Sequence, residues 1–521
     1  MNESEIELPA TPLDGTAPDA LDGAIGLPSV ERRVFCNRTL NLRKIRAIGY
    51  DMDYTLVHYN VEAWERAAYE HMQRKLIARG WPVEHLRFDP SVVIRGLMVD
   101  RELGNLIKAN RFGYVKHASH GLRRLSTIEK NRLYARTVVS PGDARYRLLD
   151  TLFSISEGVM FAQATELLDA RLLPEVMGFV ELYDAVRGAL DRAHIEGELK
   201  AEIMAHPERY VELDPAVPMT LREQQLAGHA LVLITNSDFA YTRFMMAYAF
   251  DRFLPAGTTW RDLFRLVIVS ARKPEFFGND RLPIFEVVTE DGLLRTCPSG
   301  ITSDGVYVGG HAAMVERHLG LDGSDILYIG DHMYGDVTVS KAVRRWRTAL
   351  ILRELEDEIV ALSAFRSDQR TLMGRVAQKE RLEHELSVLR LRLQDARAAA
   401  GLPAATLGSL GRRTSGDEAA APPAIAAREA ELKALRARIV ALDATIDPLA
   451  HAAEQIGNVR WGPTMRTGAD KSYLARQLER HADIYTARVS NFRLATPFAY
   501  FRAPYGSLPH DPGPGSGGDL E

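Results

Sequence analysis

Two pairs of aspartates in this sequence each follow a short apolar run. Asp51 and Asp53 come directly after the run Ile45 to Tyr50, and Asp331 and Asp336 follow the run Ile326 to Ile329 within the string GDHMYGD. Short runs rich in β-branched residues are typical of buried parallel strands, and α/β folds build their sites at the carboxyl ends of such strands. Four carboxylates that converge would repel one another without a cation. The pattern therefore predicts a divalent ion, and Mg²⁺ fits because it binds a few carboxylates together with water and substrate phosphate.

Two further polar groups follow apolar runs of the same kind. Thr235, Asn236 and Ser237 come after the run Ala230 to Ile234, and Lys273 follows Leu266 to Val269 within SARKPEFF. Hydroxyls and backbone N–H groups at the start of a helix can hold phosphate oxygens, and a lysine supplies a point charge. Each feature alone is commonly a helix cap, a solvated strand end or a surface lysine. Four of them in this order, each at a strand end, predict a site for phosphoryl transfer.

The runs that carry these residues alternate with helical stretches, which predicts an α/β fold with a Rossmann-like parallel sheet. Roughly 180 residues separate the first two runs, far more than a crossover needs, and they read mostly as helices. We therefore expect a large, mostly helical cap inserted after the first catalytic strand. The expected divisions are a disordered leader (1–30), the core (31–56 and 221–365), the cap (57–220), a paired-helix insertion (366–450) with a mobile linker (400–425), a C-terminal helical region (451–508) and a disordered tail (509–521).

The paired helices are predicted from leucines at helical spacing. The clearest positions are Leu382, Leu386, Leu389 and Leu393, followed by Leu432, Leu435, Ile439, Leu442 and Ile446. Two such stripes joined by a low-complexity linker can pair in antiparallel fashion.

Composition excludes several classes of protein. With 65 Lys and Arg against 69 Asp and Glu, the formal net charge of −4 gives no general attraction to nucleic acid polymers or to an anionic membrane. Cys36 and Cys297 lie far apart without a CxxC pair, so neither a disulfide framework nor a zinc site is indicated. The acidic N-terminus does not read as a secretory signal, and no apolar run is long enough to span a bilayer. We expect a cytoplasmic protein.

The four motifs resemble those of the haloacid dehalogenase superfamily. Longer strings, among them GYDMDYTL, TNSDFAYT, ARKPEFFG and ILYIGDHMYGDV, resemble the cytosolic purine 5′-nucleotidase (IMP-GMP specific) family of that superfamily. The resemblance runs from about residue 35 to residue 511, apart from the paired-helix region.

Residue types and resemblance together imply a mechanism through an aspartyl-phosphate. Asp51 would be the nucleophile and Asp53 the general acid and base. Thr235 and Lys273 would hold the phosphoryl oxygens, next to Asn236 and Ser237. Mg²⁺ would be held by Asp51, the backbone carbonyl of Asp53 and Asp331, with Asp336 orienting it.

The resemblance also places recognition of the base in the cap. The family's nucleotide-binding residues fall on Arg187, Asp191, His194 and Lys200, and its Phe-Asn pair on Phe153 and Ser154. Helical spacing supports a common face for the first three of these. Without the resemblance, the same helix reads as an amphipathic helix with a solvated polar face.

The implied substrates are purine nucleoside 5′-monophosphates, IMP and GMP, with transfer of phosphate to a nucleoside as a further activity and a homo-oligomer, dimer or tetramer, as the assembly. The family's ATP effector site falls on Ser140, Asp150, Tyr334 and Ala342, which lack its cations, so we expect weak ATP binding there. Two alternatives remain: a phosphatase of the superfamily acting on another phosphate ester, and a non-catalytic scaffold that assembles through the helices around 372–446.

Overall fold

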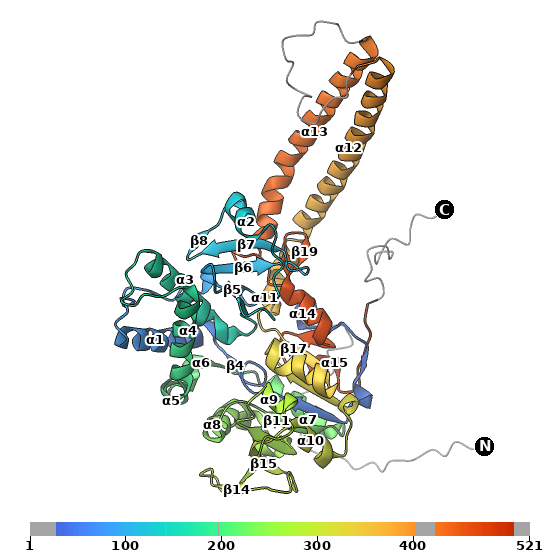
Figure 1. Ribbon diagram of the computed structural model, residues 1–521. Coiled ribbons are helices and arrows are strands. Elements are labelled where there is room, and N and C mark those ends of the chain that lie inside the picture. Colours follow the sequence, from blue (N-terminus) through green and yellow to red (C-terminus); the bar gives the residue numbers. More distant parts are fainter. Residues whose placement is uncertain (1–27, 141, 196, 403–421, 505–521) are drawn as a thin grey trace, which may run out of the picture.

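A ten-stranded sheet forms the core of the protein (Figure 1), whose computed structural model describes residues 28–140, 142–195, 197–402 and 422–504. Nearly all of the expected leader, the whole expected tail and most of the expected linker therefore lie outside the described residues. The strand order is β1-β20-β17-β16-β3-β11-β12-β15-β13-β14. The strands are β1 (Phe35–Cys36), β20 (Ile484–Thr486), β17 (Arg347–Ile351), β16 (Ile326–Gly330), β3 (Ala47–Tyr50), β11 (Ala230–Ile234), β12 (Leu266–Val269), β15 (Gly305–Gly309), β13 (Ile284–Val287) and β14 (Leu294–Thr296).

The strands from β20 to β15 run parallel. In this sheet only β1 at one edge, and β13 and β14 at the other, pair in antiparallel fashion. Every residue of β3, β12 and β16 is buried, as expected for strands covered by helices on both faces. The predicted α/β fold with a parallel sheet is confirmed. Its central strand, β3, lies between β16 and β11, so the ends of these three strands meet at one edge.

The cap follows β3 and combines helices with a second sheet. Its helices are α1 (Val61–Ala78), α2 (Thr127–Tyr134), α3 (Ile155–Asp169), α4 (Phe179–Ile195), α5 (Glu198–Ala205) and α6 (Pro207–Tyr210). The prediction of a mostly helical insertion missed a five-stranded antiparallel sheet. Its order is β8 (Arg123–Arg124), β7 (Val115–His120), β6 (Asn105–Ala109), β5 (Met98–Asp100) and β9 (Tyr146–Leu148). These strands have two to six residues, and two of them, β5 and β6, are buried throughout, so they lack the alternation that marks a half-exposed strand.

Two predicted boundaries need correction. The expected end of the cap at residue 220 falls inside α7 (Ala216–Leu226), which packs against β11 and belongs to the core. The region 451–508, expected to be helical, contains α14 (Tyr473–His481) and α15 (Asn491–Ala495) but also supplies β20, which pairs with β17. A strand of three residues is too short for its pattern to be distinguished in the sequence.

The paired helices are α12 (Arg366–Ala399) and α13 (Pro423–Glu454), which project from the body as a long arm (Figure 1). The predicted leucines form its seam: Leu382, Leu386, Leu389 and Leu393 are buried against α13. Nearer the body, the Lys379 ammonium pairs with Asp443 at 2.6 Å. At the tip, Arg397 pairs with Glu429 at 2.9 Å. The arm is therefore an antiparallel coiled coil whose apolar seam is flanked by ion pairs toward both its base and its tip.

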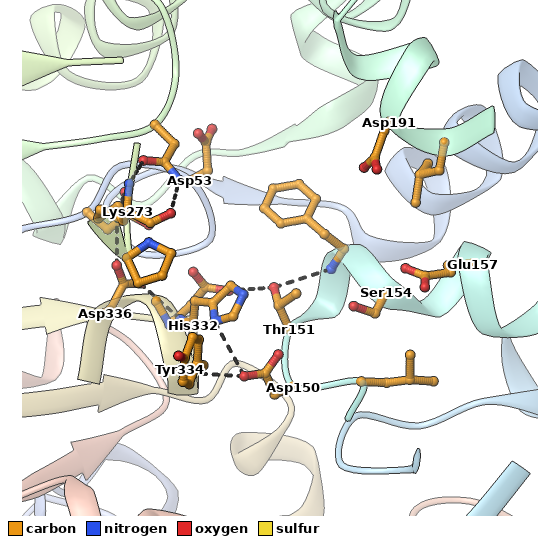
Figure 2. Close-up of a pocket in the computed structure, with 18 of the residues that line it drawn as sticks. Asp53, Asp150, Thr151, Ser154, Glu157, Asp191, Lys273, His332, Tyr334 and Asp336 are labelled. Carbon is orange, nitrogen blue, oxygen red and sulfur yellow. Dashed lines mark hydrogen bonds and ion pairs between the residues drawn. The ribbon is translucent and has the colours of Figure 1, made fainter. Parts of the chain in front are cut away.

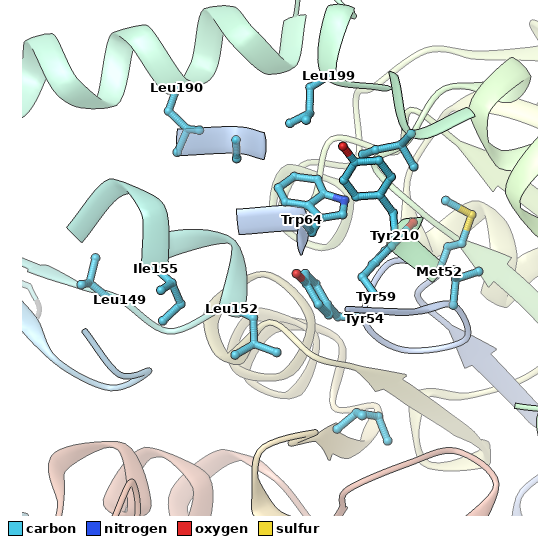
Figure 3. Packing of buried hydrophobic residues seen from close by; sticks show 14 of the residues in the cluster. Met52, Tyr54, Tyr59, Trp64, Leu149, Leu152, Ile155, Leu190, Leu199 and Tyr210 are labelled. Carbon is cyan, nitrogen blue, oxygen red and sulfur yellow. The ribbon is translucent and has the colours of Figure 1, made fainter. Parts of the chain in front are cut away.

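Aromatic side chains pack where the cap meets the loop after β3 (Figure 3). Tyr54, Tyr59 and Trp64 are nearly inaccessible and contact one another through their ring edges and faces. Such pairs add about 0.5–1.5 kcal/mol to the burial of their area. This cluster holds the cap against the end of the central strand. None of the helices in the described ranges has the length and apolar character needed to cross a bilayer.

A buried glutamate caps the helix that leads into the cap's share of the site. The Glu65 carboxylate on α1 accepts a hydrogen bond of 2.8 Å from the backbone N–H of Ser156, in the first turn of α3. This bond satisfies a donor that the helix itself leaves unpaired. Burial raises the pKa of Glu65 to about 8, and the charge of the neighbouring Glu157 adds to the rise.

We predict that Glu65→Gln stabilises the protein at pH 8 and above relative to the native chain. The pKa of Glu65 is 4.5 in the unfolded chain and about 8 in the folded protein. The stability that the protonated side chain contributes is therefore fully present below pH 4.5 and is lost as the pH rises through 8. The loss is about 3–5 kcal/mol. An uncharged amide keeps the acceptor for Ser156 without this loss.

The measurement is the free energy of unfolding by urea between pH 4.5 and pH 9. Glu62→Gln is the matched control, because Glu62 lies three residues earlier on α1 and is exposed. Equal pH profiles for Glu65→Gln and the native chain would contradict the prediction.

Candidate active site

Asp51 stands at the carboxyl end of β3, where the chain turns toward the cap. Its backbone N–H donates to the carbonyl of Ile329 at 2.9 Å, which extends the pairing with β16 by one residue. The Oδ1 atom accepts a hydrogen bond of 2.8 Å from the N–H of Met52. The carboxylate is therefore fixed by the backbone around it and is almost completely buried.

Asp331 and Asp336 follow the neighbouring strand β16. Asp331 accepts a hydrogen bond of 3.1 Å from the Thr151 hydroxyl, and Asp336 accepts one of 3.0 Å from the N–H of His332. A side chain at Gly330 could not be accommodated, because a Cβ there would lie 2.3 Å from an oxygen of Asp336. Glycine at this position lets the Asp336 carboxylate lie against the end of β16.

The carboxylates of Asp51, Asp331 and Asp336 form one cluster, in which an oxygen of each lies within 4.8 Å of the others. Lys273 reaches this cluster from the loop after β12 (Figure 2). Its Nζ atom lies 2.7 Å from Asp51 Oδ1 and 2.7 Å from Asp336 Oδ1. The backbone N–H of Lys273 donates a hydrogen bond of 2.6 Å to the side-chain amide oxygen of Asn236. The loops after β11 and β12 are joined in this way.

Burial and mutual repulsion shape the charges of this cluster. Burial raises the pKa of Asp51 well above its usual range, with the charges of Asp336 and Asp331 adding to the rise and Lys273 opposing it. Burial also raises the pKa of Asp331, to about 6, against the opposing effect of Arg95. Burial alone would lower the pKa of Lys273, but the charges of Asp336 and Asp51 outweigh burial and raise the pKa well above its usual value.

One lysine cannot balance three buried carboxylates. The remaining negative charge and the all-oxygen donor set fit a hard divalent cation such as Mg²⁺. Asp53, predicted as a fourth metal residue, has its carboxylate outside this trio. A metal contact from Asp53 would therefore come from its backbone carbonyl, as the resemblance implies.

The Asp53 carboxylate is held by two hydroxyls. Tyr59 donates to its Oδ1 at 2.5 Å, and Ser237 donates to its Oδ2 at 2.7 Å. Thr235 is buried at the end of β11, where its hydroxyl accepts from the N–H of Ser237 at 3.1 Å. The predicted phosphate-binding residues thus lie beside the predicted acid and base.

The site lies in a cavity of about 880 Å³ whose far side is formed by the cap. Phe153 and Ser154 line it, and the Phe153 ring packs edge-on against Trp64 and Tyr54. On α4, Arg187 pairs with Asp191 at 3.1 Å. Both of these residues line the same cavity.

The other two predicted base-recognition residues have different outcomes. Lys200, on α5, also lines the cavity, but it lies toward the catalytic end, where its ammonium pairs with Asp238 at 3.0 Å. His194 lies on α4, and its side chain is outside the described part of the protein.

Sequence reasoning missed several residues that complete the site. Glu157 accepts hydrogen bonds from Arg187 at 2.7 Å and from the Tyr183 hydroxyl, so it holds the Arg187 guanidinium in position. Arg95, almost fully buried, donates to the backbone carbonyls of Asp150 and Asp331. These residues carry no local motif, and their partners are 26 to 236 positions away in the sequence.

Of the four positions that correspond to the family's ATP effector site, two, Asp150 and Tyr334, are in direct contact. Asp150 accepts from the N–H of Tyr334 at 3.1 Å and lies 3.4 Å from the His332 ring at the cavity edge (Figure 2). Ser140 and Ala342 are both exposed.

The chain is similar to known proteins over most of its length. A model of the 5′ nucleotidase family matches residues 34–513. The human 5′-nucleotidase domain-containing protein 2 is 26% identical over 495 residues, which is 90% of this chain and 84% of the relative.

Two solved structures show weaker similarity. A predicted phosphoglycolate phosphatase from Haemophilus somnus has 12% identity and a TM-score of 0.26, covering 59% of this chain and 85% of that one. A haloacid dehalogenase-like hydrolase from Xanthomonas campestris has 16% identity and a TM-score of 0.23, covering 59% of this chain and 82% of that one. TM-scores this low add nothing to the fold assignment, which rests on the strand order.

Proposed function

Because the chain belongs to the 5′-nucleotidase family, we propose that it is a magnesium-dependent enzyme that hydrolyses purine nucleoside 5′-monophosphates, with IMP and GMP preferred. One observation carries the proposal: the cluster of Asp51, Asp331, Asp336 and Lys273 lies at one end of a cavity whose other end is lined by Arg187 and Asp191. About 880 Å³ is enough for a nucleotide, since small-molecule sites span about 300–1,000 Å³.

The first step forms an aspartyl-phosphate. An oxygen of Asp51 attacks phosphorus, and the bond from phosphorus to the nucleoside 5′-oxygen breaks. Asp53 gives its proton to that oxygen, so the nucleoside leaves as an alcohol. In the second step Asp53 takes a proton from water, whose oxygen attacks phosphorus and releases Asp51. A nucleoside hydroxyl in place of water would accept the phosphate instead.

Lys273 and the residues after β11 hold the phosphoryl group. The Lys273 ammonium, 2.7 Å from Asp51, offsets the charge that two approaching anions bring together. The Thr235 hydroxyl and nearby backbone N–H groups supply donors for the remaining oxygens, while the Ser237 hydroxyl donates to Asp53.

The carboxylates of Asp51, Asp331 and Asp336 would hold the magnesium ion. When bound, the ion supplies charge that polarises the phosphoryl group and balances the buried carboxylates. Thr151 and Arg95 hold Asp331 in place from the cap side.

The cap end supplies contacts for the base. Phe153 offers an aromatic face beside the cavity, while Arg187 and Asp191 offer donors and acceptors of the kind that a 6-oxopurine edge can match. Glu157 neutralises part of the Arg187 charge, so this end favours a neutral base over a second phosphate.

We predict that Asp51→Asn lowers kcat on IMP by far more than tenfold while the fold stays intact, because it removes the nucleophile at a strand end. The measurements are phosphate release and the unfolding midpoint. Asp304→Asn, at an exposed ion pair with Arg265, is the control. A variant that keeps more than about a tenth of the activity, a barrier change below ~1.4 kcal/mol, would show that Asp51 is not the nucleophile.

We predict that Mg²⁺ raises the thermal midpoint of the EDTA-treated protein, because it binds the folded carboxylate cluster and not the unfolded chain. At 100 times its Kd the stabilisation is about 2.7 kcal/mol. Asp331→Asn should lose most of this shift, whereas Asp304→Asn should keep it. An undiminished shift in Asp331→Asn would place the ion elsewhere.

We predict a higher kcat/KM for IMP and GMP than for CMP and UMP, and a changed ranking in Asp191→Ala. Asp169→Ala is the matched control, because the Asp169 side chain is as exposed as that of Asp191 but pairs with His120 at 2.7 Å and does not line the cavity. Equal values for IMP and CMP, or an unchanged ranking in Asp191→Ala, would contradict the assignment of purine recognition to α4.

A further inference from the structure

The Asp53 carboxylate differs from the metal-binding trio because both of its oxygens accept hydrogen bonds from hydroxyl groups. Ser237 donates to Oδ2 at 2.7 Å from the cavity side, and Tyr59 donates to Oδ1 at 2.5 Å. Ser237 lines the cavity, whereas Tyr59 is 1% exposed and does not line it. The two oxygens of Asp53 therefore face different surroundings, one the substrate space and the other the core.

Tyr59 has a second partner that fixes the direction of its hydrogen bond. The hydroxyl of Tyr241, on α8 (Phe239–Phe250), lies 3.1 Å from the Tyr59 hydroxyl. Because the single proton of Tyr59 goes to Asp53, Tyr241 donates to the Tyr59 oxygen. Tyr59 then has both its proton and its acceptor position engaged, so it cannot reverse its role without breaking the bond to Tyr241.

Packing holds Tyr59 in one position. It belongs to β4 (His58–Tyr59), which pairs with β10 (Val211–Glu212) at the base of the cap. Its ring meets Tyr54 edge to face at 5.2 Å and lies 6.2 Å from Trp64 (Figure 3). Tyr241 is 3% exposed, and its backbone N–H is bound by the side chain of Asp238, which caps α8. Both phenols are thus held by packing and hydrogen bonds, and Tyr241, unlike Tyr59, also lines the cavity.

We propose that Tyr59, oriented by Tyr241, is a positioning residue for proton transfer by Asp53. This inference rests on the proposed function. Tyr59 keeps Oδ1 as a permanent acceptor, so the transferable proton of Asp53 is carried by Oδ2, the oxygen beside Ser237 and the cavity. The Ser237 hydroxyl can rotate and accept when Oδ2 is protonated, whereas Tyr59 stays a donor.

The proton balance over one turnover follows from this arrangement. As Asp51 bonds to phosphorus and the ester bond breaks, the proton on Oδ2 moves to the 5′-oxygen, and the Tyr59 hydrogen bond stabilises the carboxylate left behind. Water then gives a proton to Oδ2 while its oxygen displaces Asp51. Asp53 ends as it began, and Tyr59 exchanges no proton with substrate.

Tyr59→Phe tests the proposal through the leaving group. An alkyl leaving group such as the inosine of IMP must be protonated, whereas p-nitrophenolate leaves as a stable anion. We expect kcat/KM for IMP, which reports expulsion of the leaving group, to fall at least about tenfold, part of the 10²–10⁴ that general acid–base catalysis supplies. For p-nitrophenyl phosphate it should change by less than about twofold. A purely structural role would lower both alike.

Tyr69→Phe is the matched control, because Tyr69 is equally buried but donates to Gln163 at 2.5 Å, away from the cavity. It should leave both esters unaffected. Tyr241→Phe should also lower kcat/KM for IMP and not for p-nitrophenyl phosphate, by a smaller factor than Tyr59→Phe. If Tyr59→Phe has a lower unfolding midpoint than Tyr69→Phe, the test rests on Tyr241→Phe.

The outcomes separate the two claims. Equal loss on both esters, or no loss on either, in Tyr59→Phe and Tyr241→Phe would overturn the positioning role while leaving the nucleotidase proposal standing. A native protein that hydrolyses p-nitrophenyl phosphate but no nucleotide would overturn the proposed substrate and not the role of Tyr59, provided that the variants slow other alkyl phosphates selectively. A native protein inactive on both esters would overturn both claims.

Discussion

Three carboxylates buried around one lysine are the constraint on which the site depends. Asp51, Asp331 and Asp336 lie close together and are almost fully buried, so charging all three is costly, and Lys273 offsets only part of that charge. The repulsion among these carboxylates matters for the proposed phosphoryl transfer. Under the proposed function, this repulsion would favour binding of a divalent cation together with a substrate phosphate beside Asp51, the proposed nucleophile.

The sheet supplies the geometry that makes this clustering possible. Because β3 is central and parallel to both β16 and β11, three loops reach the same edge within a few ångströms of one another. The cap closes the space above that edge, and its aromatic contacts with the loop after β3 join the cap side of the cavity to the core. The long arm lies outside this arrangement, and none of its residues lines the cavity.

The cluster at the ends of the strands could be predicted because each of its residues is local to a strand end. Asp51, Thr235, Lys273 and Asp331 sit directly after apolar runs, and the rule that parallel strands end at one edge brings them together. The cap could be predicted less well. Its short strands carry no clear period, and Glu157 and Arg95 act through partners that only the folded chain brings close. Tyr59 was hidden for the same reason, because nothing in the sequence shows that its hydroxyl reaches Asp53.

The central claim is that a covalent phosphoenzyme forms on Asp51, and it can be measured directly. The protein is mixed with IMP and Mg²⁺, quenched in acid within milliseconds and treated with borohydride, which reduces an acyl phosphate to an alcohol. Peptide mass spectrometry then locates the reduced residue. The account predicts reduction at position 51 alone, dependent on IMP and on Mg²⁺. Reduction at Asp53 or Asp331, or no reduction while phosphate is released at full rate, would contradict it.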